Sequence, residues 1–188
     1  GSNFSFRRVE NVGPKVSGEL LKSGLIAIVL SLSAMLIYIW IRFEWQFSLG
    51  AIIALIHDVI ITIGFFSILE FEINLSIVAA VLTIVGYSMN DTVVIFDRVR
   101  ENLKKYSSKS INEISNLSIN ETLSRTIITS LTTLLALLSI FFFGGKILHG
   151  FSFAMILGVI FGTYSSIFIA NPILIKLKVN QKSVLKGE

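Results

Sequence analysis

A carboxylate inside an apolar helix is the residue of this sequence best suited to chemistry. Asp91 lies in a run that otherwise has the composition of a membrane-spanning helix, and Asn90 directly precedes it. A charged carboxylate near the centre of a bilayer span costs about 2.5–3.5 kcal/mol on insertion scales. A chain keeps such a group when it has a partner, a cavity or a function, so we expect Asp91 to bind and release protons. The alternative is a packing residue permanently paired with Arg125 or Asn90.

Arg125, on the next apolar run, is the basic partner that the spacing offers to Asp91. The polar residues around Asp91 recur at helical steps and are predicted to share one face: Thr83, Tyr87, Asn90, Asp91 and Arg98. The next run carries a stripe of small and polar residues: Arg125, Thr129, Thr132, Thr133, Ala136 and Ser139. If these stripes pack together, Asp91 meets Arg125, and protonation of Asp91 would release the guanidinium. The alternative for Arg125 is a side chain that only reaches out to the membrane interface.

A second polar pair, His57 and Asp58, lies near mid-depth of another apolar run. Adjacent residues point about 100° apart on a helix, so the two cannot both face one partner. The pair is either a second proton site or part of a hydrogen-bonded polar core, to which Tyr87 and Thr129 would also belong. No metal site is expected, because the chain has only two histidines, His57 and His149, and they are predicted at different depths.

The composition indicates a membrane protein. The chain is 53% hydrophobic and 15% charged, with a mean hydropathy of +0.79, whereas soluble domains carry about 25% charged residues. It has no cysteine, which excludes disulfides and thiolate metal sites. Five apolar runs have the length of about 20 residues that crosses a bilayer: 23–41, 47–69, 73–96, 122–143 and 150–175. They predict an all-α polytopic membrane protein, a bundle of five transmembrane helices.

Basic residues predict how this bundle is oriented. We expect residues 1–17 to end an external domain, 18–178 to form the membrane domain and 179–188 to form a tail. Lysine and arginine are concentrated between the third and fourth runs and in the tail, so the positive-inside rule places both segments in the cytoplasm and the N-terminal segment outside. The net charge of +4 therefore reflects topology rather than nucleic-acid binding. Between the runs, Ile111, Ile114 and Leu117 predict either a short interfacial helix or a solvated loop.

The remaining motifs concern packing rather than catalysis. Gly158 and Gly162 form a small-xxx-small pattern, which lets membrane helices approach closely. The sequence contains no phosphate-binding loop, nucleophile motif or zinc signature. An enzyme is therefore not expected, and neither is a cofactor other than the proton as coupling ion.

Seven short motifs together resemble the SecF members of the SecD/SecF family of protein-export membrane proteins, over roughly 12–177. They are VGP at 12–14, RFEW at 42–45, ALIHDV at 54–59, GYSMNDT at 86–92, DRVREN at 97–102, TLSRT at 122–126 and TSLTT at 129–133. Met89 stands where the family more often has leucine or isoleucine. Family members have six spans with an external domain after the first, so the resemblance implies that this chain lacks the first span and most of that domain.

The resemblance also implies a fold and a function. The fold would resemble half of the membrane domain of a resistance-nodulation-division transporter. The function would be auxiliary: with SecD, in the bacterial inner membrane, using the proton motive force to drive preprotein translocation through the SecYEG channel. In the family, the residues matching Asp91 and Arg125 are tied to proton use. Two alternatives stay open, namely half of a proton-driven small-molecule efflux pump and a structural subunit without proton coupling.

Overall fold

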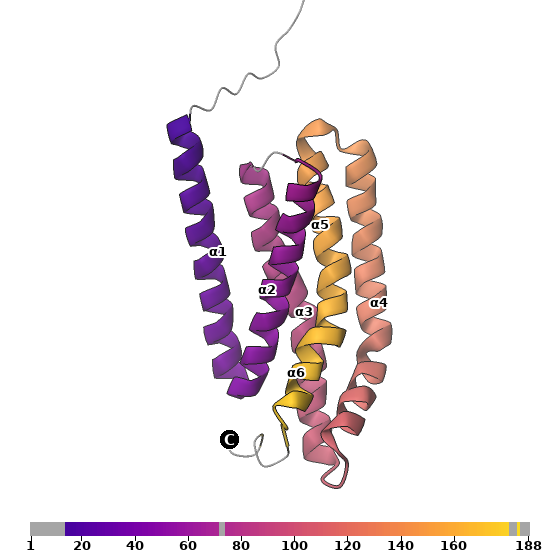
Figure 1. Ribbon diagram of the computed structural model, residues 1–188. Helices are drawn as coiled ribbons and strands as arrows, with labels where there is room; N and C mark the ends of the chain where they lie inside the picture. Colours follow the sequence, from indigo (N-terminus) through magenta and orange to yellow (C-terminus); the bar gives the residue numbers. More distant parts are fainter. Residues whose placement is uncertain (1–13, 72–73, 181–183, 185–188) are drawn as a thin grey trace, which may run out of the picture.

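Six α-helices and one π-helical segment make up the described part of the chain (Figure 1). The structure is a computed structural model, and it describes residues 14–71, 74–180 and 184. Its elements are α1 (Pro14–Arg42), α2 (Trp45–Ile68), α3 (Leu75–Lys105), α4 (Ile111–Phe143), α5 (Lys146–Ser165), the π-helix η1 (Ser166–Ala170) and α6 (Asn171–Lys176). No strand occurs among these residues, so the predicted all-α class is confirmed. Most of the expected external segment, and of the tail, lies outside the described residues.

The five predicted spans are present, and several are longer than expected. Helices long and apolar enough to cross a membrane cover Lys22–Arg42, Trp45–Ile68, Ser76–Lys105, Ile111–Phe143 and Lys146–Lys176 in the described part of the chain. The predicted short helix or loop around Ile114 is wrong, because this residue belongs to the first turns of α4. A capping box starts that helix early: Glu113 accepts the Ser110 backbone N–H at 2.8 Å, and the Ser110 hydroxyl accepts the Glu113 N–H at 3.4 Å.

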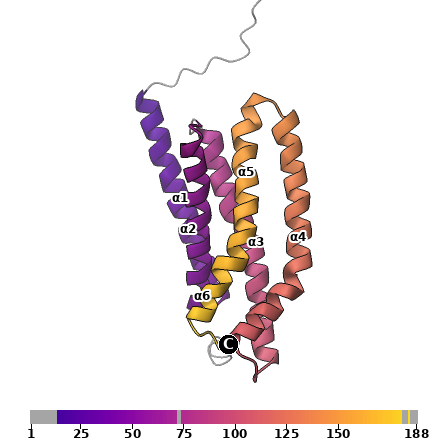
Figure 2. The ribbon, with the colours of Figure 1, turned by 45° about the vertical axis from the view of Figure 1, so that its right-hand side comes forward.

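The five long helices run up and down side by side in one bundle (Figures 1 and 2). α3 and α5 lie in the middle of the bundle, while α1 and α4 lie at its two flanks. The α1–α2 turn, the α3–α4 loop and the end of α6 share one end of the bundle, which we call the basic end because α3 finishes there with Lys104 and Lys105. The α2–α3 and α4–α5 connections lie at the opposite end.

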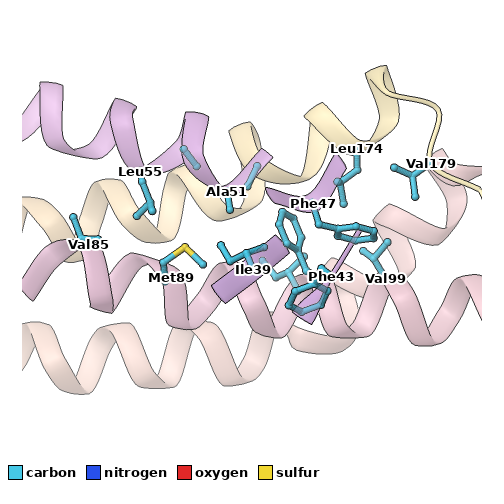
Figure 3. Close-up of a cluster of buried hydrophobic side chains, with 14 of the residues drawn as sticks. Ile39, Phe43, Phe47, Ala51, Leu55, Val85, Met89, Val99, Leu174 and Val179 are labelled. Carbon is cyan, nitrogen blue, oxygen red and sulfur yellow. The ribbon is translucent and has the colours of Figure 1, made fainter. Parts of the chain in front are cut away.

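Two separate hydrophobic clusters form the core. One is centred on the basic half, where Phe96 meets Phe47 edge to face with ring centroids 5.1 Å apart. Figure 3 shows Phe47 of this cluster beside Val99 and Leu174. The other cluster lies toward the opposite end and includes Phe66 and Met155. On α2, α4 and α5, buried polar residues lie between the two clusters, and together with Ser88 and Asp91 of α3 they form the candidate site.

A proline accounts for the π-helical segment that joins α5 to α6. Pro172 has no N–H to donate to the carbonyl of Phe168, four residues earlier, and its ring crowds that carbonyl. The chain widens to π geometry over Ser166–Ala170 and then continues as α6. Single-turn π segments of this kind are common next to functional sites. Here the segment begins at the second of two adjacent buried serines, Ser165 and Ser166.

Candidate functional site: two buried carboxylates

Asp58 is the more completely hydrogen-bonded of the two buried carboxylates in the candidate site, Asp58 and Asp91. It is 0% exposed, and its Oδ2 accepts hydrogen bonds from the hydroxyls of Ser88 at 2.6 Å and Ser165 at 2.8 Å. His57 Nδ1 lies 3.0 Å from Oδ1 of the same carboxylate. These are ordinary or short hydrogen-bond lengths. Asp58 therefore ties α2 to α3 through Ser88 and to α5 through Ser165, as expected for a residue of a polar core.

Asp91 is buried nearly as deeply but held much less firmly. It is 4% exposed, and its Oδ2 lies 3.5 Å from both Ser130 Oγ of α4 and Thr163 Oγ1 of α5. The two hydroxyls lie only 2.7 Å from each other. Since O–H···O bonds usually measure about 2.5–3.0 Å, both contacts to Asp91 are long. Asp91 is thus a carboxylate inside a membrane-spanning helix whose partners among the described residues satisfy it weakly.

The two carboxylates differ in how much hydrogen bonding a change of charge would disturb. Removing an acceptor that is held by short bonds leaves buried donors unpaired, which costs about 1–3 kcal/mol for each group. Asp58 has such bonds on both oxygens and resists any change of state. A change in the charge or position of Asp91 would disturb only weak hydrogen bonds, because its contacts are already long. A group of that kind is suited to gain and lose a proton.

Arg125 does not form an ion pair with Asp91 in this structure. Its side chain is exposed, and no ion pair within 4.0 Å links these two residues. Arg125 is nevertheless close enough to contribute electrostatically to Asp91. The contact expected from the sequence is absent because α4 turns a different face inward. Between Ile114 and Leu137 the buried residues of α4 are Ser115, Ser118, Thr122, Thr126 and Ser130, not the stripe that contains Arg125.

The stripe that contains Arg125 instead forms part of an exposed polar face. Tyr87 of α3 donates its hydroxyl to the carbonyl oxygen of Thr129 of α4 at 3.4 Å. Asn90 lies about one turn from Tyr87, and Arg125 about one turn from Thr129, on antiparallel helices. Both Asn90 and Arg125 are exposed. We use the term exposed polar face for four exposed residues of the spanning helices: Thr83, Asn90, Arg125 and Thr132.

This arrangement corrects the prediction that Thr83, Asn90 and Asp91 share one face. Asp91 is buried against α4 and α5, whereas Thr83 and Asn90 are exposed. The four-residue step groups Thr83 with Tyr87, and Asn90 follows at the next three-residue step. Asp91 then lies about 100° further around the helix, which is enough to carry it from the surface into the core.

Gly158 and Gly162 lie where α5 crosses α3. A Cβ atom at Gly158 would fall 2.2 Å from Ile84 Cγ1, and one at Gly162 would fall 3.0 Å from Ser88 Cβ. The two glycines therefore allow α5 to lie directly on α3, as small-xxx-small patterns do in membrane bundles. This close approach brings the Ser165 and Thr163 hydroxyls within reach of the two carboxylates.

The sequence reasoning missed four hydroxyl residues that hold the carboxylates: Ser88, Ser130, Thr163 and Ser165. Serine and threonine are common in membrane helices, where they often bond to their own backbone. In the sequence nothing distinguishes such residues from those that reach across to another helix. The one available signal was that Ser88 lies three residues before Asp91, about one helical turn away.

Ion pairs hold the basic end together. Arg98 donates to Glu121 of α4 and to Glu101, each at 2.6 Å, and Asn102 donates to Glu121 at 2.8 Å. These contacts fix the register of α3 on α4 below Asp91. At the α1–α2 turn, Arg42 donates to Asp97 of α3 at 3.1 Å. The charged residues of the DRVREN motif therefore dock α3 onto its neighbours.

Comparison with known proteins identifies the family. Residues 1–180 match the family described as "Protein export membrane protein SecD/SecF, C-terminal". The chain is 59% identical over 172 residues to the protein translocase subunit SecF of Rickettsia bellii, covering 92% of this chain and 57% of that protein. It is 52% identical over 179 residues to the protein translocase subunit SecF of Cereibacter sphaeroides, covering 95% of this chain and 55% of that one. The chain thus spans little more than half the length of these relatives.

Solved structures give the same result for the fold. The crystal structure of SecDF from Thermus thermophilus, described as a translocon-associated membrane protein, matches with a TM-score of 0.85 and 43% identity, over 88% of this chain and 23% of that one. SecDF in its super-membrane-facing form matches with a TM-score of 0.80 and 41% identity, over 89% of this chain and 22% of that one. The chain belongs to the SecD/SecF family of protein-export membrane proteins.

Proposed function

We propose that this chain is the membrane part of an auxiliary subunit of the Sec export machinery, which uses the proton motive force with SecD to drive preprotein translocation through the SecYEG channel. One observation carries the proposal. Asp91 is a buried carboxylate on a spanning helix, and its contacts to Ser130 and Thr163 are both 3.5 Å long. The names of the relatives, translocase subunit SecF, support export as the process that is driven. The role is that of a transport component rather than an enzyme.

Protonation of Asp91 is the coupling step in this proposal. Moving one elementary charge through the membrane potential delivers about 2.3 kcal/mol per 100 mV. A free-energy difference of about 1.4 kcal/mol changes an equilibrium constant tenfold. One proton is therefore sufficient to change the equilibrium between two packings of the helices by more than tenfold. A protonated Asp91 can donate a hydrogen bond to Ser130 or Thr163, whereas the carboxylate can only accept. The two protonation states therefore favour different packings of α3 against α4 and α5.

Arg125 and Asn90 belong to the same step, on the surface side of Asp91. Arg125 carries a long side chain and already acts electrostatically on Asp91. When Asp91 is ionised, inward movement of the guanidinium would neutralise the buried charge. When Asp91 is protonated, the guanidinium would be released to the surface, where Asn90 is also exposed. The proton thus controls where a second charge lies.

The exposed polar face is the surface at which we place SecD. Polar groups on a membrane helix are costly in contact with lipid and usually face a protein or a water-filled cavity. Thr83, Asn90, Arg125 and Thr132 are exposed in this chain alone. A partner subunit packed there would remove them from lipid. In this arrangement the basic end faces the cytoplasm, the N-terminal segment lies outside, and the remaining apolar flanks face the lipid of the bacterial inner membrane.

The test is force-dependent export in inverted membrane vesicles that carry the full-length protein with its partner. Asp91→Asn keeps the shape of the side chain but cannot ionise, so we expect it to insert normally and to lose the force-dependent part of export. The matched control is Glu101→Gln, an exposed acidic residue on the same helix whose partner Arg98 keeps Glu121. Full force-dependent export with Asp91→Asn would refute proton coupling and would favour a purely structural subunit.

A further inference from the structure

The inward face of α4 carries hydroxyls where a membrane helix usually carries apolar side chains. Between Ile114 and Leu137, every buried residue of α4 is serine or threonine: Ser115, Ser118, Thr122, Thr126 and Ser130. We call this set the hydroxyl stripe. Small residues at helix interfaces can serve packing alone. The two ends of the hydroxyl stripe, and its unpaired atoms, indicate more than packing.

One end of the hydroxyl stripe meets Asp91 and the other meets charged groups at the basic end. Ser130 Oγ lies 3.5 Å from Asp91 Oδ2. Near the start of α4, Ser118 Oγ accepts from Asn102 Nδ2 at 3.0 Å, and the same amide donates to Glu121 at 2.8 Å. Glu121 is an exposed residue. The hydroxyl stripe therefore connects the buried carboxylate with a carboxylate at the surface.

Two buried oxygen atoms along the hydroxyl stripe have no hydrogen-bond partner. Thr126 is 1% exposed, and its Oγ1 has none, although the residue lies one turn from Ser130. Asn171 of α6 is also 1% exposed; its amide nitrogen donates to Ser115 Oγ, while its Oδ1 has no partner. An unpaired buried polar atom costs about 1–3 kcal/mol. In proteins such atoms are usually satisfied by buried water.

The spacing of side chains along a helix determines what can lie between neighbouring hydroxyls of the hydroxyl stripe. Side chains one turn apart lie about 5–6 Å from each other, which is too far for one hydroxyl to bond directly to the next. A single water molecule between two hydroxyls closes such a gap with two ordinary hydrogen bonds. Thr126 is the position where this matters most, because Ser118 and Thr122 already donate to backbone carbonyls of α4.

We propose that the hydroxyl stripe, linked by water, is the route by which Asp91 exchanges its proton with the solution at the basic end. The inference rests on the proposed function of Asp91. In each release, the O–H bond of the Asp91 carboxyl breaks and its proton passes to a water between Ser130 and Thr126. Each hydroxyl or water that accepts a proton passes another one on, so a proton leaves as hydronium near Glu121 and Asp91 is left ionised. Uptake is the reverse.

The experiment compares Thr126→Val, which removes the hydroxyl at nearly constant volume, with Ser124→Ala, which removes an exposed hydroxyl of the same helix outside the hydroxyl stripe and the exposed polar face. The full-length protein with its partner is reconstituted in liposomes and subjected to a pH jump, and infrared spectroscopy follows the carboxyl stretch that disappears in Asp91→Asn. We expect Thr126→Val to slow this signal without changing its final amplitude. Ser124→Ala and the hydroxyl-preserving Thr126→Ser should retain the wild-type rate. Thr122→Val is a second blocking variant, in case Thr126→Val does not fold.

Two results would overturn the proposal, and they are distinguishable. If the Asp91 signal follows pH but keeps its wild-type rate in both Thr126→Val and Thr122→Val, the proton takes another route and the proposed function stands. If the wild-type protein shows no pH-dependent Asp91 signal at all, the proposed function fails and the route fails with it.

Discussion

The contact between Gly158 of α5 and Ile84 of α3 allows a quantitative prediction. A Cβ atom at Gly158 would lie 2.2 Å from Ile84 Cγ1, 2.6 Å from Cδ1 and 2.9 Å from Cγ2. Cγ1 and Cγ2 both branch from the Cβ of Ile84, and one χ1 rotamer strongly dominates for isoleucine in a helix, so rotation does not relieve both clashes. The helices must move apart if Gly158 becomes alanine.

The expected cost follows from two opposing effects. Overpacking a well-packed core costs about 1–3 kcal/mol, and replacing glycine by alanine in a helix returns up to about 1 kcal/mol. All three contacts at Gly158 are shorter than 3.0 Å, so the overpacking cost should lie in the upper part of that range, about 2–3 kcal/mol. After the gain in helix propensity, Gly158→Ala should lower the free energy of unfolding by about 1–2 kcal/mol. In the double variant with Ile84→Ala, the added methyl group has room, so Gly158→Ala should cost little in that background.

The assay is reversible unfolding by SDS in mixed micelles, followed by circular dichroism. Gly64→Ala is the matched control, since a Cβ atom at Gly64 of α2 meets nothing within 4 Å. That variant should be as stable as the wild type or slightly more stable. The reasoning would be refuted if Gly158→Ala were as stable as Gly64→Ala, or if Ile84→Ala did not remove the cost of Gly158→Ala.

Three further predictions use the same unfolding measurement or hydrogen exchange. Asp58→Ala leaves the Ser88 hydroxyl without its acceptor and should cost about 2–4 kcal/mol, whereas Asp58→Asn keeps an acceptor and should cost less; equal costs would contradict the hydrogen-bond assignment. Ser110→Ala removes a helix cap worth about 1 kcal/mol, so amides in the first turn of α4 should exchange faster, and unchanged exchange would count against the capping box. Phe96→Ala opens a cavity beside Phe47 and should cost about 3–5 kcal/mol; a cost below 1 kcal/mol, roughly that of a surface change, would show that the cluster in Figure 3 does not pack as described.

The fold could be predicted from the sequence because a membrane span leaves a strong local signal. Each span needs about 20 apolar residues regardless of its neighbours, so the five runs located the five helices. The ends were harder to place, because α3 and α4 continue past the apolar runs into charged sequence. The early start of α4 depends on the capping box of Ser110 with Glu113, a local signal that was overlooked in the sequence, whereas the contact of Arg98 with Glu121 forms only when the two helices meet.

The candidate site was only partly predictable, for a different physical reason. The cost of a charge in a membrane identified Asp91 and Asp58 as buried polar groups. It did not show that Asp58 is tightly bonded and Asp91 loosely bonded, because that difference depends on hydroxyls of two other helices. The prediction that the stripe containing Arg125 is the inward face of α4 was wrong for a similar reason. Serine and threonine occur on both of its faces, so hydrophobic periodicity cannot decide which of them points inward.

Proton flux is the measurement that tests the central claim most directly. Liposomes that contain the full-length protein with its partner are given a membrane potential, and a trapped pH-sensitive dye reports proton entry. We expect the wild-type protein and Glu101→Gln to carry a potential-driven flux, and Asp91→Asn to carry none. An undiminished flux with Asp91→Asn would contradict proton coupling through Asp91, because protons would then cross without this buried and weakly hydrogen-bonded carboxylate.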